Sequence, residues 1–238
     1  MIRTVIFILA LLCTVYALEQ NVTDSSLGFE RLVDVEKATT RTILYGLLFF
    51  EAQTPQNLEV HLQRIQEKAL DNINNTINRA LEDVNLSLQK GKEEGKNVGT
   101  CYHYAENNLE SKRTNAIVGL DICIQNGRTA MKGPLANVVS SIQAAEKLLN
   151  DLNAIIPNCN STSFLKKQAC VLKNLSLTRE SLKSVAKNSM EVVTITTGIY
   201  MKTLVNVKSC IVKNIAETYT FSMNIVRYTN NCINNAFF

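Results

Sequence analysis

The chain has 238 residues, of which 46% are hydrophobic, and a formal net charge of +4. Its lysines and arginines are scattered along the sequence and not clustered, which argues against a surface for nucleic acid. With three prolines, nine glycines and no tryptophan, the composition favours long helices over a turn-rich β-sandwich.

The N-terminal stretch has the features of a secretory signal peptide. Arg3 precedes an apolar run that is shorter than the roughly 20 residues needed to span a bilayer. Val15 and Ala17 supply the small residues of a cleavage site, so we expect residues 1–17 to be removed. Cleavage takes away Cys13 and leaves an even number of cysteines, which in an oxidising compartment favours disulfides. The sequence therefore predicts a secreted, extracellular protein without a transmembrane segment.

Asn-x-Ser/Thr sequons occur along the chain and predict a glycoprotein with these sites on its surface. The acceptor asparagines are Asn21, Asn74, Asn85, Asn160 and Asn174.

Residues 18–98 are expected to form an N-terminal helical arm. Apolar residues recur at helical spacing over residues 29–47 and again over 58–88. Thr54-Pro55 lies between these stretches and is typical of a helix start, because threonine caps a helix and proline suits the first helical position. A charged linker with three glycines, residues 91–99, ends the arm. This linker lacks the spacing of a phosphate-binding loop, so we expect no nucleotide.

One part of the arm, residues 43–50, is apolar on all sides. It is either a buried helix end or a docking patch for a partner or lipid, since large exposed apolar patches usually mark interaction sites. The possible partner patch consists of Ile43, Leu44, Leu47, Leu48, Phe49 and Phe50.

Residues 99–238 hold the six remaining cysteines and are expected to form a helical domain of their own. Helical patterns cover residues 101–133, 135–156, 164–190 and about 195–233. Gly133-Pro134 is read as a break or kink, and residues 157–163 as a turn. Residues 192–197 are β-branched, but no second strand-like run is present to pair with them, so we expect a helix there too.

This order predicts an all-α fold, with long antiparallel helices in a disulfide-stapled up-down bundle preceded by the N-terminal arm. In an up-down-up-down arrangement the first and last helices of the domain lie side by side and antiparallel.

The cysteine spacing restricts the disulfide pairing. Cys101 and Cys123 are 22 residues apart, and so are Cys210 and Cys232. At about 3.6 residues per turn each pair lies on one face of a helix but roughly 33 Å apart, which is too far for a disulfide. Antiparallel helices would join Cys101 to Cys232 and Cys123 to Cys210. A parallel arrangement, joining Cys101 to Cys210 and Cys123 to Cys232, fits the spacing equally well.

The two central cysteines, Cys159 and Cys170, flank the predicted turn. In the nested, antiparallel arrangement they form a third disulfide that staples this turn, with Asn160 glycosylated at its tip.

Residues suited to catalysis or metal binding are few. His61 and His103 are read as surface histidines, and no recognised hydrolase, metalloprotease or redox motif occurs. Carboxylates such as Glu82, Asp83 and Glu106 lie among polar residues and are read as solvated helix surface. We therefore expect no enzyme, no catalytic residue, no cofactor and no metal site.

The cysteine pattern C-x21-C, C-x10-C, C-x39-C, together with the signal peptide, the sequons and the helical body, resembles the secreted insect proteins with a TsetseEP domain. The matching positions are Cys101, Cys123, Cys159, Cys170 and Cys210. The resemblance covers roughly residues 95–215 and implies an extracellular insect glycoprotein with no established catalytic residues. This chain has no Glu-Pro dipeptide, so functions assigned to the Glu-Pro repeat tail of the founding member do not transfer.

Taken together, these features predict a non-enzymatic protein that acts by binding in an insect extracellular space, such as gut, gland or reproductive fluid. The alternative is an extracellular carrier that holds a small apolar ligand between its helices. The expected partner is an extracellular protein or surface, and nucleic acid is not expected.

Overall fold

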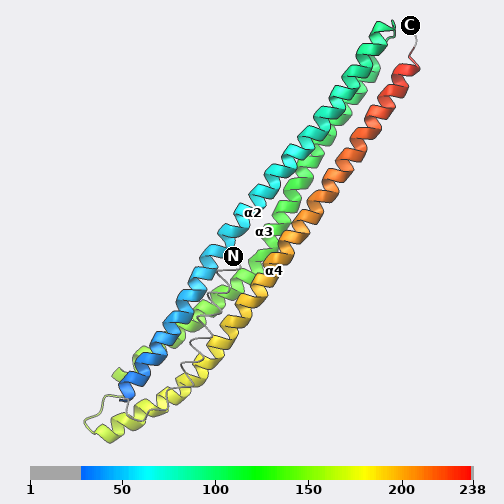
Figure 1. The fold of residues 1–238 in the computed structure, drawn as a ribbon. Coiled ribbons are helices and arrows are strands. Elements are labelled where there is room, and N and C mark those ends of the chain that lie inside the picture. The colour runs from blue at the N-terminus through cyan, green and yellow to red at the C-terminus, as the bar shows by residue number, and fades with distance from the viewer. Residues whose placement is uncertain (1–27, 237–238) are drawn as a thin grey trace. The chain divides into compact units, whose positions relative to one another are not determined.

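The computed structural model describes residues 28–236. Over this range the chain forms three α-helices and no strand: α2 (Phe29–Glu93), α3 (Gly99–Asn158) and α4 (Phe164–Asn234) (Figure 1). The prediction of an all-α, disulfide-stapled helical bundle is therefore confirmed. The predicted signal peptide and the sequon at Asn21 lie outside the described residues.

Proline does not interrupt α2, so the prediction of a helix start at Thr54-Pro55 is wrong. Pro55 lies inside the helix, and the hydroxyl of Thr54 donates to the carbonyl oxygen of Phe50 at 2.7 Å. Phe50 and Leu58, on either side of this turn, are both buried. Burial of the apolar face on both sides of the proline outweighs the cost of about 3 kcal/mol that proline imposes inside a helix.

The predicted division of residues 99–238 into four helices is also wrong, because α3 and α4 are each continuous. Pro134 lies inside α3, between the buried residues Met131 and Val138. Residues 192–197 lie within α4, as predicted, and Val193 and Thr196 face the core. The turn predicted at residues 157–163 joins α3 to α4 and begins directly after Asn158.

The described chain divides into two compact units, and each takes a segment from all three helices. Unit 1 comprises residues 28–58 and 130–201, and unit 2 comprises residues 59–129 and 202–236. This division does not follow the boundary expected between residues 98 and 99, because α2 contributes a segment to each unit. The reason is that a single amphipathic helix buries its apolar face only against other helices.

The core of unit 1 consists mainly of large aliphatic side chains. It includes residues from the first half of α2, the second half of α3 and the first half of α4: Val33, Ile43, Leu47, Phe50, Val138, Leu148, Leu152, Val171, Leu182 and Val193. At about 1.5–3 kcal/mol for each fully buried side chain of this type, this burial is the main stabilising term of the unit.

In unit 2 the helices approach each other at small residues. A Cβ atom added at Gly127 would lie 2.7 Å from Cγ2 of Val207 and 3.4 Å from a methyl carbon of Leu62. A Cβ atom at Gly119 would lie 3.1 Å from Nδ2 of Asn214, which donates to the carbonyl of Ala116 at 2.6 Å. The absence of a side chain at these glycines is therefore what lets α3 and α4 lie close together in this unit.

Candidate functional site

Two disulfides join α3 to α4 within unit 2. Cys101 bonds to Cys232 and Cys123 bonds to Cys210, with Cα–Cα distances of 5.8 Å and 5.9 Å. The structure thus has the nested pairing of antiparallel helices and not the parallel one. Ala105 and Ala116 lie buried on the same face of α3, which gives the two helices the small-residue contact that an interhelical disulfide requires.

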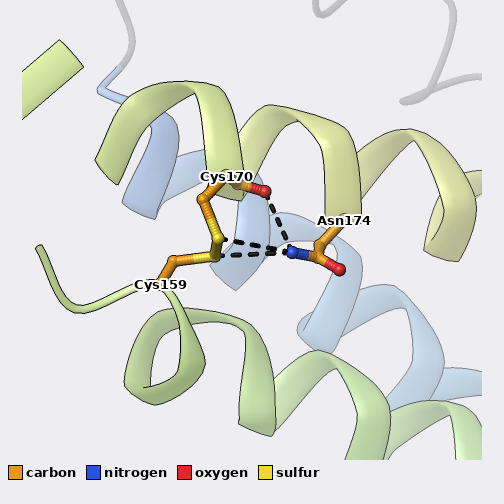
Figure 2. Close-up of a disulfide and its surroundings, with 3 residues drawn as sticks. All are labelled: Cys159, Cys170 and Asn174. Atoms are coloured by element: carbon orange, nitrogen blue, oxygen red, sulfur yellow. Dashed lines mark hydrogen bonds between the residues drawn. A yellow bond between two sulfur atoms is a disulfide. The ribbon is translucent and has the colours of Figure 1, made fainter. Parts of the chain in front are cut away.

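The third disulfide joins Cys159 to Cys170 across the turn in unit 1. Figure 2 shows the side chain of Asn174 beside it, with the amide nitrogen turned toward both sulfur atoms. This nitrogen donates to the carbonyl oxygen of Cys170 at 3.0 Å and lies 3.4 Å from Sγ of Cys159. Asn174 is four residues after Cys170, so one turn of α4 brings the two together.

The four sequons in the described chain differ in their surroundings. Asn160 is exposed and lies between α3 and α4, outside any helix. Asn85 is exposed on α2, whereas Asn74 on α2 and Asn174 on α4 are partly buried. Of these four sequon asparagines, one therefore lies in a loop and three lie in helices.

Residues 43–50, expected to form either a buried helix end or a partner patch, are largely core, which favours the first of these two interpretations. Ile43, Leu44, Leu47 and Phe50 are buried, with exposures of 1%, 8%, 2% and 4%. The run is apolar on all sides because one face of α2 packs into unit 1 while the opposite face also carries apolar side chains.

What remains on the surface is a shorter apolar row on α2. Leu48 and Phe49 are exposed by 39% and 50%, and Tyr45 beside them by 66%. Spacings of three and four residues place these side chains on one face of the helix. We call Tyr45, Leu48 and Phe49 the α2 apolar row.

Unit 2 contains a cleft of about 630 Å³ beside the Cys101–Cys232 disulfide. Amide side chains of Asn97, Asn231 and Asn235 line it, together with Tyr228. The ring of Tyr228 packs against Tyr104 with 4.5 Å between ring centroids. The lining is uncharged and combines amide groups with apolar surface from Cys101, Cys232 and Ala236.

Two tyrosines of the described residues have raised pKa values. The pKa of Tyr102 is raised by its hydrogen bond to Glu106, 2.8 Å long, and burial raises the pKa of Tyr200. His103 is exposed and its ring lies 5.5 Å from that of Tyr102. Within residues 28–236, no group of three or more His, Cys, Asp or Glu side chains is arranged to hold a metal ion.

A buried carboxylate in unit 1 was not singled out from the sequence. Glu36 is only 5% exposed; its Oε1 accepts from Nε of Arg179 at 3.1 Å, and its Oε2 accepts from the hydroxyl of Thr178 at 3.1 Å. The sequence could have indicated this burial through the position of Glu36. It lies between Val33 and Thr40 at the helical spacing of the core-facing residues. A charge in a core stripe indicates a buried partner.

Comparison of the chain with protein-family models, with curated proteins and with solved structures gives no match. Over the described residues, none of the helices combines the length and the hydropathy needed to cross a membrane.

Proposed function

We propose that the protein is a secreted, glycosylated, non-enzymatic protein that acts by binding to an extracellular surface or protein. Following the cysteine pattern that resembles TsetseEP-domain proteins, we propose an insect gut, gland or reproductive fluid as the site of action. The observation that carries the proposal is the set of three disulfides, two of them between long helices. Disulfides of this kind persist in oxidising compartments and are rare in the cytosol.

The position of Asn160 supports the glycosylated state. This asparagine is exposed in the loop between α3 and α4, directly after Cys159, and surface loops are where N-linked sugars are accommodated.

The α2 apolar row supports action by binding. Tyr45, Leu48 and Phe49 expose apolar surface on one helix face, and clustered aromatic and aliphatic side chains are the usual anchors of protein interfaces.

The test is saturable binding of the labelled protein to epithelial surfaces of gut, gland and reproductive tract. We expect binding to one of these tissues and a loss of at least about tenfold in affinity when Tyr45, Leu48 and Phe49 are all changed to serine. The matched control changes Val205, Val212 and Tyr219, which are exposed by 64%, 64% and 57% on α4, to serine. No saturable binding to any of the three tissues contradicts the proposal.

The alternative is a carrier of a small apolar ligand. Native mass spectrometry of protein from its own tissue separates the two functions. A stoichiometric lipid supports the carrier, and a mass equal to polypeptide plus sugar supports surface binding.

A further inference from the structure

Asn174 is a position at which two covalent modifications meet. It is the acceptor of an Asn-Leu-Ser sequon, and N-linked sugar joins asparagine at Nδ2. In the structure this same atom donates to the carbonyl of Cys170 at 3.0 Å, and it lies 3.4 Å from Sγ of Cys159 and 3.6 Å from Sγ of Cys170 (Figure 2). The atom that would carry the sugar is therefore turned toward the disulfide.

The sequon lies within a helix, and its serine is also hydrogen-bonded. Asn174 lies inside α4, which begins at Phe164, and the hydroxyl of Ser176 donates to the carbonyl of Lys173 at 2.9 Å. Asn160 is on the other side of the same disulfide and is exposed in the loop. The acceptor inside the disulfide loop is thus exposed, whereas the acceptor after it is partly buried with its amide nitrogen hydrogen-bonded.

We propose that closure of the Cys159–Cys170 disulfide withholds Asn174 from glycosylation, so that the folded protein carries sugar at Asn160 and a free amide at Asn174. The inference rests on the proposed passage through the secretory pathway. There the two cysteine thiols give two electrons and two protons to the disulfide oxidants of the compartment, and the S–S bond forms. The opposing reaction takes an oligosaccharide from a lipid-pyrophosphate donor. The bond between sugar C1 and the pyrophosphate oxygen breaks, the C1–Nδ2 bond forms, and one amide proton is released.

The two reactions compete over a short stretch of chain. The cysteines are 11 residues apart, so their thiols meet within about 10–100 ns once the chain is free to move, and the oxidant then sets the rate of disulfide formation, over seconds or longer. Asn174 follows Cys170 by four residues and therefore becomes accessible only just after it. A sugar on Nδ2 would leave one N–H and place a bulky substituent on an atom that lies 3.4 Å from a disulfide sulfur, so each modification disfavours the other.

The experiment measures sugar occupancy at each sequon in the full chain expressed through an insect-cell secretory host. Treatment with a peptide N-glycosidase in heavy-oxygen water marks each formerly occupied asparagine. Trypsin then separates Asn174, between Lys173 and Arg179, from Asn160, between Lys147 and Lys166. We expect high occupancy at Asn160 and, in the variant Cys159→Ala/Cys170→Ala, a rise of at least about fivefold at Asn174 over the wild type.

The matched control is Cys123→Ala/Cys210→Ala, which removes a disulfide remote from Asn174 in sequence and leaves its occupancy unchanged. Asn85 controls for helical position, because it is helical but exposed. If the Cys159/Cys170 variant is not secreted, a pulse of dithiothreitol during synthesis of the wild type gives the same rise at Asn174.

Equal occupancy of Asn174 in the wild type and in the Cys159/Cys170 variant overturns the inference, whether that occupancy is high or absent. Because the host imposes the secretory route, this result is independent of the natural location of the protein. Failure of the tissue-binding test would leave the competition between sugar and disulfide unaffected.

Discussion

The two units are built from the same three helices but are held together differently. In unit 2, α3 and α4 are joined by two disulfides and meet at residues as small as Gly119 and Gly127. In unit 1 the disulfide lies at the turn, the helices are packed through large aliphatic side chains, and Glu36 is also buried. In unit 2 the covalent links between helices therefore coincide with points of close approach, beside a core that also contains large side chains such as Leu109 and Ile225.

This difference matters most for α2, which has no cysteine. In unit 2 it contributes Ile77, Val84 and Leu88 to the core and also makes polar contacts with α3, such as Arg128–Glu59 and Gln66–Asp121. In unit 1 it contributes Ile43, Leu47 and Phe50 to the core. The cross-links constrain the α3–α4 pair, and α2 depends on side chains in both units.

The largest expected effect is the loss of an interhelical disulfide. Cys123→Ala/Cys210→Ala should lower the free energy of unfolding by about 2–4 kcal/mol, since this disulfide constrains a long loop in the unfolded chain. The sequence separation is 87 residues for this pair and 11 for Cys159–Cys170, so removing the latter should cost less. Urea unfolding followed by circular dichroism measures both, and hydrogen exchange locates the loss. An equal loss of unfolding free energy on removing Cys123–Cys210 and Cys159–Cys170 would contradict the difference between the interhelical disulfides of unit 2 and the turn disulfide of unit 1.

A second effect tests close packing in unit 2. Gly127→Ala should destabilise by about 1–3 kcal/mol, because the new Cβ atom would lie 2.7 Å from Val207. The matched control is Gly198→Ala, inside α4, where nothing lies within 4 Å of the added atom and the better helix propensity of alanine should stabilise by up to about 1 kcal/mol. Melting temperatures of the two variants should move in opposite directions. A shared upward shift would show that α3 and α4 are not in close contact at Gly127.

In unit 1 the corresponding test is the buried ion pair. Arg179→Ala leaves the Glu36 carboxylate buried with fewer partners and should destabilise by about 1–2 kcal/mol; this is less than for a fully buried pair because the side chain of Arg179 is 48% exposed. Lys183→Ala, which removes the exposed pair with Glu180, should change stability by less than about 0.5 kcal/mol. Equal urea midpoints for Arg179→Ala and Lys183→Ala would argue against a stabilising contribution of the buried pair between Glu36 and Arg179.

The smallest effect concerns acid stability in unit 2. The hydrogen bond from Arg128 lowers the pKa of Glu59 below its ordinary value of about 4.3. The resulting stabilisation is present above that ordinary value and is lost as the pH falls through the lower pKa of the folded state. Arg128→Gln should therefore reduce the drop in melting temperature between neutral and acidic pH, and Lys213→Gln should not. The change is small because both side chains of the pair are partly exposed. An unchanged pH dependence would contradict the contribution of this pair.

The helical fold and the restriction to two disulfide pairings were accessible from the sequence because both depend on helix periodicity, whereas the spacing alone did not distinguish the nested pairing from the parallel one. A spacing of 22 residues fixes the face on which Cys101 and Cys123 lie, whatever surrounds them. The prolines were misread because local propensity favours a break at Pro55 and Pro134, whereas burial on both sides of each keeps the helix continuous. Local rules do not include that tertiary contribution.

The exposed residues were harder to predict than the helices and the disulfides. Residues 43–50 are apolar all round, so periodicity could not tell which of them face the core. The contact of Asn174 with the disulfide was also hidden, although its signal is simple: an asparagine one turn after a cysteine in a helix. The position of this asparagine beside the sulfur atoms follows only once the helix and the disulfide pairing are both known.

The central claim, that α3 and α4 are joined antiparallel by nested disulfides in unit 2, has a direct test. Trypsin cleaves between all six cysteines, at Lys112 or Arg113, Lys166 or Lys167, Arg227 and other sites, so non-reducing peptide mapping of the oxidised protein reads the pairing. The account predicts linked peptides for Cys101–Cys232, Cys123–Cys210 and Cys159–Cys170. Peptides linking Cys101 to Cys210 and Cys123 to Cys232 would contradict it.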